Sequence, residues 1–417
     1  MNEHVSRPVP VTMKMVADAY QKVRRGGQAP GIDGESWEEF DKRVEDNLYV
    51  IWNRMSSGSY HPQAVREVEI PKKDGSKRKL GIPVIRDRIA QCVVKDYMEK
   101  QIDEQFSNHS YGYRQMKGSK EAVEEVRRNC MHHDWVIDMD IEKFFDELDH
   151  ELLIKAVEAM IEASWVKMYV RRWLEMGIQT KDGTRNDRKG KGTPQGGVIS
   201  PLLANLFLHY ALDKWLEKNY EHVRFVRYAD DVIVHCDSKE EAEQLLKAIE
   251  TRLEEVKLRL NKIKTRIVYC KDYKRKEEHK EVKFEFLGFS YQPRSRPSQY
   301  GENSFLAFTA EISQSNAKKI REAIRSLKEW RNTGIEVEDI ALKLNSKLRG
   351  WINYFGRYSK GQLRHALLQV DYCLIKWIKK KHKLSGIRKA VKIRDELKDR
   401  IRKEGVAIFY HWGCGYG

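Results

Sequence analysis

The sequence has little of what marks a secreted, a membrane-bound or a zinc-binding protein. Only six of the 417 residues are cysteine, and no two of them have the spacing Cys-x-x-Cys. This usage favours neither a disulfide framework nor a zinc site, and it fits a reducing compartment. No apolar run reaches about 18 residues, the length that spans a membrane. The first residues lack the apolar core of a secretory signal, and no internal repeat is evident.

Negative charge is also scarce relative to positive charge. Lysine and arginine number 78 against 62 aspartate and glutamate residues, which gives a net charge of +16. Such an excess favours a polyanionic partner, above all nucleic acid, and without a lipidation signal we expect no membrane partner. We therefore expect a cytoplasmic protein, associated with the nucleoid in a prokaryote. The length allows two or three domains.

One stretch carries two adjacent acids between two apolar runs. Residues 225–234 read Phe-Val-Arg-Tyr-Ala-Asp-Asp-Val-Ile-Val, a pattern that predicts a β-hairpin with Asp230 and Asp231 at its tip. Two carboxylates there repel each other, and a pair of divalent cations about 3.5–4 Å apart would remove that repulsion and support a phosphoryl displacement. The alternative is an ordinary turn, since aspartate is a common turn residue.

A second acidic strand end lies earlier in the chain. Residues 135–146 predict a buried strand that passes into a helix, with Asp138 and Asp140 on one face of the strand. Acids are rarely buried unless they are paired or bind a metal, so a metal site shared with the hairpin is favoured over a solvated strand end. Periodicity does not separate Asp138 from Asp140.

Two other segments suit a phosphorylated ligand. Residues 65–83 predict a hairpin that carries Arg66, Lys72 and Arg78, which are candidate triphosphate ligands or merely solubilising charges. In residues 193–201 the glycines after Gln195 allow close approach of a ligand to the backbone. Ser200 is predicted to cap the helix that follows.

The C-terminal part is predicted to be helical from residue 313 to near residue 404, after a connection at residues 293–297. Its last helices are rich in lysine and arginine. The lysines at 379, 380 and 381 follow the aromatic residues Tyr372 and Trp377. This interleaving is typical of nucleic-acid contact, and a solvated basic face is the alternative.

Taken in order, these blocks resemble those of reverse transcriptases encoded by group II introns, which also act as maturases. The resemblance covers nearly the whole chain. It rests on the loop at 26–34, Ile70-Pro71-Lys72, Ser110-Tyr111-Gly112-Tyr113-Arg114, Asp138-Met139-Asp140 with Phe144-Phe145-Asp146, Thr193-Pro194-Gln195-Gly196-Gly197, Tyr228-Ala229-Asp230-Asp231, Leu287-Gly288-Phe289 and Gly350-Trp351-Ile352-Asn353-Tyr354-Phe355.

The resemblance implies an α+β right-hand polymerase fold, with fingers, a palm with an antiparallel sheet, and an all-helical thumb. The implied domains are an N-terminal extension with a template-side glycine loop at 1–60, fingers and palm at 61–300, a basic thumb or maturase domain at 305–405, and a short tail at 406–417. No His/Asn/Cys array suited to a nuclease is evident, so the chain resembles members that lack an endonuclease.

The resemblance also assigns roles to individual residues. In the family the metal-binding acid precedes an aromatic residue beside the nucleotide sugar by five positions, which selects Asp140 with Phe145 and leaves Asp138 as an alternative. Asp140, Asp230 and Asp231 are then the catalytic ligands of two Mg²⁺ ions, with Mn²⁺ as a substitute. The other implied contacts are Arg66, Lys72, Arg78, Phe145, Gln195, Gly196 and Lys264 to the nucleotide, and Gly31, Gly34, Tyr228, Trp377, Lys379, Lys380 and Lys381 to nucleic acid.

The expected activity is RNA-directed DNA polymerisation, with a deoxynucleoside triphosphate added to a primer 3′-hydroxyl. The expected partners are template or intron RNA, primer or target DNA and dNTPs, in support of splicing and retrohoming, and a homodimer is left open. Two alternatives remain: a free-standing enzyme recruited to DNA repair or phage defence, and an RNA-binding splicing factor whose polymerase activity is secondary.

Overall fold

The computed structural model describes residues 9–71, 77–180, 183–297, 304–404 and 407–417, and of residues 401–404 only the backbone. The chain forms two compact units. The first contains residues up to 122 together with 137–267, and the second contains residues 123–136 and 268–417. Among the described residues no helix combines the length and the apolar character that crossing a membrane requires.

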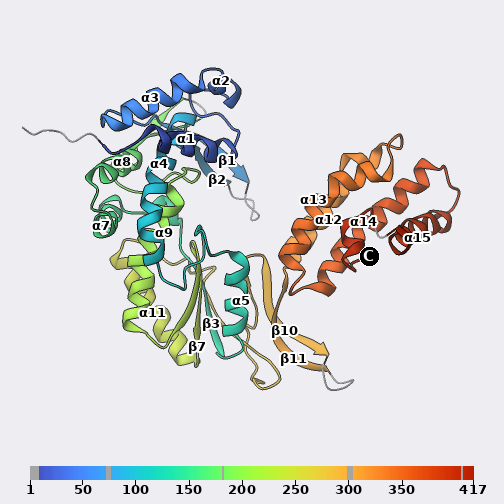
Figure 1. The fold of residues 1–417 in the computed structure, drawn as a ribbon. Coiled ribbons are helices and arrows are strands. Elements are labelled where there is room, and N and C mark those ends of the chain that lie inside the picture. The colour runs from blue at the N-terminus through green and yellow to red at the C-terminus, as the bar shows by residue number, and fades with distance from the viewer. Residues whose placement is uncertain (1–8, 72–76, 181–182, 298–303, 405–406) are drawn as a thin grey trace, which may run out of the picture. The chain divides into compact units, whose positions relative to one another are not determined.

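The first unit has helices at its N-terminal end and two sheets (Figure 1). The elements up to residue 186, of which α5 lies mostly in the second unit, are α1 (Met13–Arg24), α2 (Trp37–Asp41), α3 (Val44–Ser56), β1 (Val65–Pro71), β2 (Lys77–Ile82), α4 (Ile85–Ile102), η1 (Asp103–Gln105), α5 (Ser119–Asn129), β3 (Trp135–Asp140), α6 (Phe144–Glu147), α7 (His150–Met160), α8 (Ser164–Glu175), β4 (Ile178–Gln179) and β5 (Arg185–Asn186). After these come α9 (Ser200–Leu208), η2 (His209–Asp213), α10 (Lys214–Asn219), β6 (Arg224–Tyr228), β7 (Asp231–Cys236), α11 (Lys239–Glu255) and β8 (Arg266–Tyr269).

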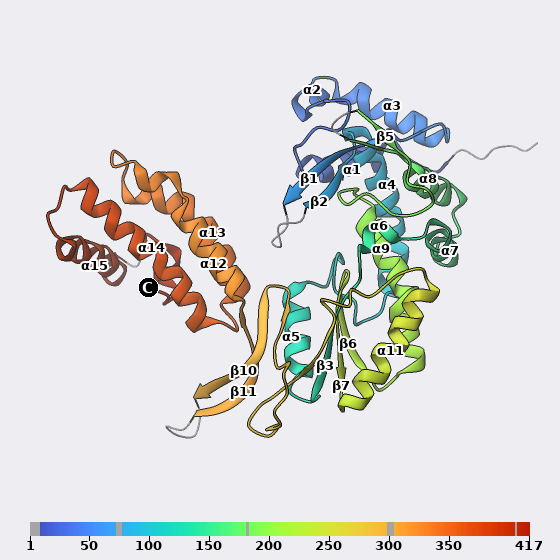
Figure 2. The same ribbon diagram turned by 180° about the vertical axis from the view of Figure 1, so that it is seen from behind.

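Both predicted hairpins of this unit are present. Strands β1 and β2 pair antiparallel with Ile70 opposite Arg78, and β6 and β7 pair antiparallel with Tyr228 opposite Asp231. The second hairpin belongs to a four-stranded sheet of order β6-β7-β3-β8, in which β3 is the next neighbour of β7. This order brings the two predicted acidic strand ends onto adjacent strands. Helix α11 packs against β7 beside this sheet (Figure 2).

Local chemistry explains where the helices begin. Ser36 caps α2 as a capping box: its side chain accepts from the backbone of Glu39, and the Glu39 carboxylate accepts from the backbone of Ser36 at 2.7 Å. The predicted cap at Ser200 is wrong. Ser200 is the first residue of α9, and its hydroxyl hydrogen-bonds the Thr193 hydroxyl at 2.9 Å because both side chains are buried together.

The second unit contains most of α5, and from residue 284 onward it has strands followed by a bundle of helices. The elements from residue 284 onward are β9 (Phe284–Phe286), β10 (Phe289–Pro297), β11 (Ser304–Ile312), α12 (Gln314–Arg325), η3 (Lys328–Arg331), α13 (Val337–Phe355), α14 (Lys360–Lys381), α15 (Ile387–Glu404) and α16 (Tyr410–Gly413). Helix α14 packs against α12 and α15. The connection predicted at 293–297 is wrong, because these residues extend β10, which pairs with β11 along its whole length.

The C-terminal residues pack onto the helices of this unit. Asn345 of α13 donates to the carbonyl of Ile408 at 2.9 Å and accepts from the backbone of Tyr410 at 2.8 Å. Phe409 and Trp412 are buried. Strand β11 occupies the start of the region predicted to be an all-helical thumb, and the helices follow it. The predicted boundaries at residues 60, 300 and 305 stay predictions.

Candidate active site

The turn between β6 and β7 holds two carboxylates in a strained backbone. Ala229 and Asp230 form a two-residue connection between the paired residues Tyr228 and Asp231. Ala229 has a φ of 58° and is buried. A positive φ at a residue with a Cβ atom costs about 1–3 kcal/mol and persists only where its surroundings enforce it. The turn is therefore held by contacts outside its own sequence.

Both carboxylates of this turn have a raised pKa. Asp231 is accessible to solvent, yet desolvation by the surrounding protein and then the charges of Asp230, Asp140 and Asp138 raise its pKa to about 7. Desolvation, followed by repulsion from Asp140, also raises the pKa of Asp230. These shifts show that the acid of β3 and the two acids of the turn form one electrostatic cluster.

Asp140 is the member of β3 that acts on both acids of the turn. Its carboxylate accepts from the ammonium of Lys264 at 3.3 Å. Asp138 lies on the same face of β3 and accepts from Arg266 at 3.0 Å. The charge of Asp140 raises the pKa of both Asp230 and Asp231, and it raises that of Asp231 more than the charge of Asp138 does. These electrostatic effects favour Asp140 over Asp138 as the third ligand.

The donor set suits a hard divalent cation. Carboxylate oxygens are the ligands that Mg²⁺ and Mn²⁺ prefer, and a bound cation would offset the repulsion and the desolvation that raise the pKa of Asp230 and Asp231. Within the described ranges no group of three or more His, Cys, Asp or Glu side chains is already arranged around one metal position. The residues fit the cation by their chemistry.

Two neighbouring phenylalanines at α6 have different environments. Phe144 is buried at 2% exposure, whereas Phe145 is half-buried. The carbonyl of Phe145 accepts from the backbone of Thr193 at 2.8 Å, so the segment after Gly192 runs along this residue. Phe145 is therefore partly accessible, whereas Phe144 belongs to the core, and the nucleotide-side assignment of Phe145 stays a prediction.

Comparison with known proteins identifies this arrangement. Residues 70–291, more than half of the chain, match the family model for reverse transcriptase (RNA-dependent DNA polymerase). The chain belongs to the reverse transcriptases. Residues 317–395 match the maturase-specific domain of group II introns. Together the two matches show a group II intron-encoded reverse transcriptase and maturase, with RNA-directed DNA polymerase activity and a role in splicing.

Curated relatives agree with the family. Protein YkfC of Escherichia coli (strain K12) is 30% identical over 341 residues, covering 73% of this chain and 85% of the relative. The group II intron-encoded protein LtrA of Lactococcus lactis subsp. cremoris is 26% identical, covering 88% of this chain and 72% of the relative. Telomerase from Candida albicans, solved with a fragment of telomeric RNA, aligns at 11% identity with a TM-score of 0.47 and covers 87% of this chain and 66% of its own, a likeness that adds no weight.

Membership of this family implies two general properties of the protein. The reverse transcriptase domain implies catalysis that depends on divalent metal ions. The two domains together imply binding of template or intron RNA. The positions of the residues predicted to bind the nucleotide and the nucleic acid bear on how each property arises.

The two described basic residues of the β1–β2 hairpin that were predicted to bind the triphosphate, Arg66 and Arg78, have different environments. Arg78 is exposed, and its charge acts on Asp230 by lowering a pKa that desolvation raises, so it lies within reach of the acidic cluster. Arg66 instead donates to the carbonyl of Pro30 at 2.7 Å, which ties β1 to the glycine loop. Lys72 lies outside the described residues.

Gln195 and Gly196 lie against β2. The backbone carbonyl of Gln195 accepts from Gly81 at 2.8 Å. Gly196 has a φ of 118°, and a Cβ atom there would lie 2.8 Å from the Gly81 carbonyl. Contact with β2 therefore already requires glycine at position 196, whether or not a ligand approaches the backbone there. Gly196 itself is exposed.

Three predicted nucleic-acid contacts have different positions. Gly31 is buried, and a Cβ atom there would lie 2.5 Å from the Cα of Val84, so packing alone explains this glycine. Gly34 is exposed with a φ of 72°. Tyr228 is half-buried, with its ring centroid 6.5 Å from that of Tyr113, which is 52% exposed.

The basic end of α14 corrects one prediction outright. Trp377 is buried at 4% exposure and donates to the carbonyl of Asn332 at 2.8 Å, so its ring is not available to stack on a base. Lys381 donates to the carbonyl of Ile335 and to Glu336, which gives it a structural role. Lys379 and Lys380 are exposed.

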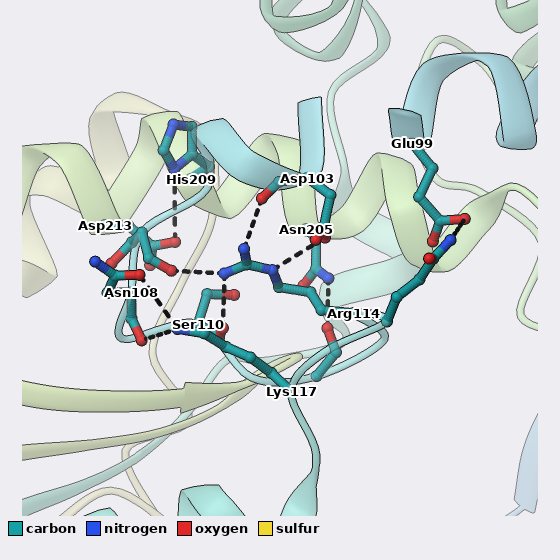
Figure 3. Close-up of polar contacts among 12 residues, drawn as sticks. Glu99, Asp103, Asn108, Ser110, Arg114, Lys117, Asn205, His209 and Asp213 are labelled. Carbon is teal, nitrogen blue, oxygen red and sulfur yellow. Dashed lines mark hydrogen bonds and ion pairs between the residues drawn. The ribbon is translucent and has the colours of Figure 1, made fainter. Parts of the chain in front are cut away.

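Sequence reasoning missed the buried polar side chains that support the acidic turn. Arg227 and Asp213 have 0% exposure and form an ion pair, and Asn205 lies beside them at 1% exposure. Figure 3 shows Asn205, His209 and Asp213 on one helical stretch next to the loop that carries Ser110 and Arg114. The signal in the sequence was an arginine between apolar residues of β6 and an aspartate in the apolar helix before it, since charges are rarely buried alone.

Proposed function

We propose that Asp140, Asp230 and Asp231 are the catalytic carboxylates of this reverse transcriptase and that they hold two Mg²⁺ ions. The observation that carries the proposal is that Asp140 on β3 lies close enough to the turn of the neighbouring hairpin for its charge to raise the pKa of both Asp230 and Asp231. When bound, such ions supply activation of the primer 3′-hydroxyl and stabilisation of the leaving pyrophosphate. In the reaction the hydroxyl oxygen forms a bond to the α-phosphate of the dNTP as the bond to pyrophosphate breaks.

The remaining side chains bind and orient the nucleotide. Arg78 neutralises the triphosphate from the exposed side of β2, and Lys72 of the same hairpin is proposed to do so as well. Lys264, whose ammonium pairs with Asp140, is proposed to donate a proton to the leaving pyrophosphate. The ring of Phe145 packs under the deoxyribose and excludes a 2′-hydroxyl.

The biological role proposed for the chain is assistance to splicing and retrohoming of a group II intron. Its partners are intron RNA, a DNA primer or target and dNTPs, with a homodimer left open, and the proposed location is cytoplasmic at the nucleoid. The maturase-specific match supports this role over the free-standing alternative. The gene's position supplies a direct test, because an open reading frame inside a group II intron is expected.

A matched pair of substitutions on β3 tests the ligand assignment. Asp140→Asn is expected to reduce primer extension to background, because it removes a charge from the metal-binding cluster. Asp138→Asn removes the charge that pairs with Arg266 but leaves Asp140 in place, and it is expected to retain extension. Extension should be measured with poly(rA) template and oligo(dT) primer, with melting temperatures as the check on folding. Loss of activity in Asp138→Asn alone would move the ligand to Asp138.

A further inference from the structure

The guanidinium of Arg227 forms a bidentate ion pair with the carboxylate of Asp213. Its Nε donates to Oδ1 of Asp213 at 2.7 Å, and its Nη2 donates to Oδ2 of Asp213 at 2.5 Å. Both side chains are completely buried. The adjacent His209 lies 3.9 Å from Asp213, and burial lowers its pKa to about 4, so it is neutral at neutral pH. The pair is therefore one positive and one negative charge.

The remaining nitrogen of Arg227 reaches the strained turn. Its Nη1 donates to the backbone carbonyl of Ala229 at 3.1 Å and to Oδ1 of Asn205 at 3.0 Å. Ala229 is the residue with a φ of 58°, directly before Asp230. One rigid planar group thus connects a buried carboxylate to the backbone that carries the catalytic acids.

The loop that contains His109, Tyr111 and Gly112 packs against the same turn. Asn205 donates to the carbonyl of Gly112 at 2.6 Å. A Cβ atom on Gly112 would lie 2.5 Å from the backbone nitrogen of Ala229, so only glycine allows this approach. The backbone of Arg227 also bonds this loop, donating to His109 and accepting from Tyr111 at 2.8 Å each. Loop, turn and arginine are fixed together.

The helix that supplies Asp213 is locally widened. Residues His209–Asp213 form a π-helical turn between α9 and α10. Arg252 of α11 donates to the carbonyl of Ala211 in this turn at 2.9 Å. Single π-turns within α-helices are frequent at functional sites. Here Asn205 and Asp213, eight positions apart, both meet the guanidinium of Arg227.

Net stability does not explain such a buried pair. An apolar pair of similar volume is often as stable as a buried ion pair, because desolvation of the charges offsets their attraction. What an apolar pair lacks is a donor for the Ala229 carbonyl. We propose that Arg227, oriented by Asp213, is a positioning residue that fixes the Tyr228–Asp231 turn in its catalytic geometry. This inference rests on the catalytic role proposed for Asp230 and Asp231.

Two variants separate positioning from simple stabilisation. In R227M/D213L both charges are replaced, so the variant is expected to fold, with a melting temperature lowered only by the lost hydrogen bonds to Ala229 and Asn205. R227K keeps the ion pair but cannot reach Asp213 and Ala229 together, since a lysine is a single point donor. In both variants kcat for extension is expected to fall about 10²-fold, the order that a 1 Å misplacement costs, with the KM for dTTP unchanged.

Asp87→Asn is the matched control. Asp87 is also completely buried, accepts from Tyr60 at 2.6 Å and from the backbone of Gln63 at 2.9 Å, and belongs to α4. It should lower the melting temperature while the folded protein keeps its kcat. A folded R227K or R227M/D213L whose kcat equals that of the unsubstituted chain would overturn the inference. An unsubstituted chain without extension activity would instead overturn the proposed function, so the two failures are distinct.

Discussion

The acidic turn of β6 and β7 and the basic end of α14 differ in how their charges are held. The turn is enforced by a buried arginine, a glycine without room for a side chain and hydrogen bonds to a second loop. On α14, Lys379 and Lys380 are exposed at the ends of long side chains. Chemistry at a fixed position needs support within the fold, whereas attraction to a polyanion needs only accessible charge.

The largest expected effect in this comparison is the loss of stability when Trp377 of α14 is substituted. Because its ring is buried and its indole nitrogen donates to Asn332, Trp377→Ala should destabilise the chain by about 3–5 kcal/mol. Tyr372→Ala is the control on the same helix, since Tyr372 is 53% exposed. Chemical denaturation of both variants measures the difference. Equal stability of the two would remove the core assignment of Trp377.

At the acidic site, substitution of Phe145 is expected to change the selectivity for the sugar of the nucleotide. Phe145→Ala should raise ribonucleotide incorporation relative to deoxyribonucleotide, because the ring blocks the 2′-hydroxyl by volume. Pockets of this kind discriminate by about 1–3 kcal/mol, roughly 10–200-fold in the ratio of kcat/KM values. The buried Phe144 is the control, and Phe144→Ala should lose stability and both substrates equally. If only Phe144→Ala changed sugar selectivity, the spacing from Asp140 would be misassigned.

The lysines of α14 give the smallest expected effect. Removing Lys379 and Lys380 should flatten the dependence of log K for RNA on log salt by about 0.7 for each single-strand phosphate that the variant no longer neutralises. Lys381→Ala should leave the slope unchanged and lower stability, because this lysine bonds Ile335 and Glu336. A slope that responds to Lys381 alone would reverse these roles. Filter binding across a salt series provides the measurement.

The sequence predicts best where a motif combines local pattern and chemistry. The two apolar runs on either side of Asp230 and Asp231 predicted a hairpin that is present. The match to the reverse transcriptase family confirms the expected fold and activity. These features depend on neighbours in the chain, which a sequence displays directly.

Prediction failed where the deciding contact is distant in sequence. Nothing near Trp377 shows that its ring packs toward Asn332, and nothing near Gly31 shows that Val84 blocks a side chain there. The pairing of Arg227 with Asp213 depends on a π-turn that periodicity does not reveal. The roles assigned to Arg78, Gln195 and Lys264 stay predictions until they are measured.

One measurement tests the central claim that the acids catalyse while exposed basic residues bind RNA. The double substitution Asp230→Ala with Asp231→Ala should be compared with the unsubstituted chain in primer extension and in a gel shift with the same RNA. The account predicts extension at background with an unchanged Kd for RNA, because the carboxylates contribute no attraction to phosphate. Extension by the double variant at a rate comparable to the unsubstituted chain would contradict it.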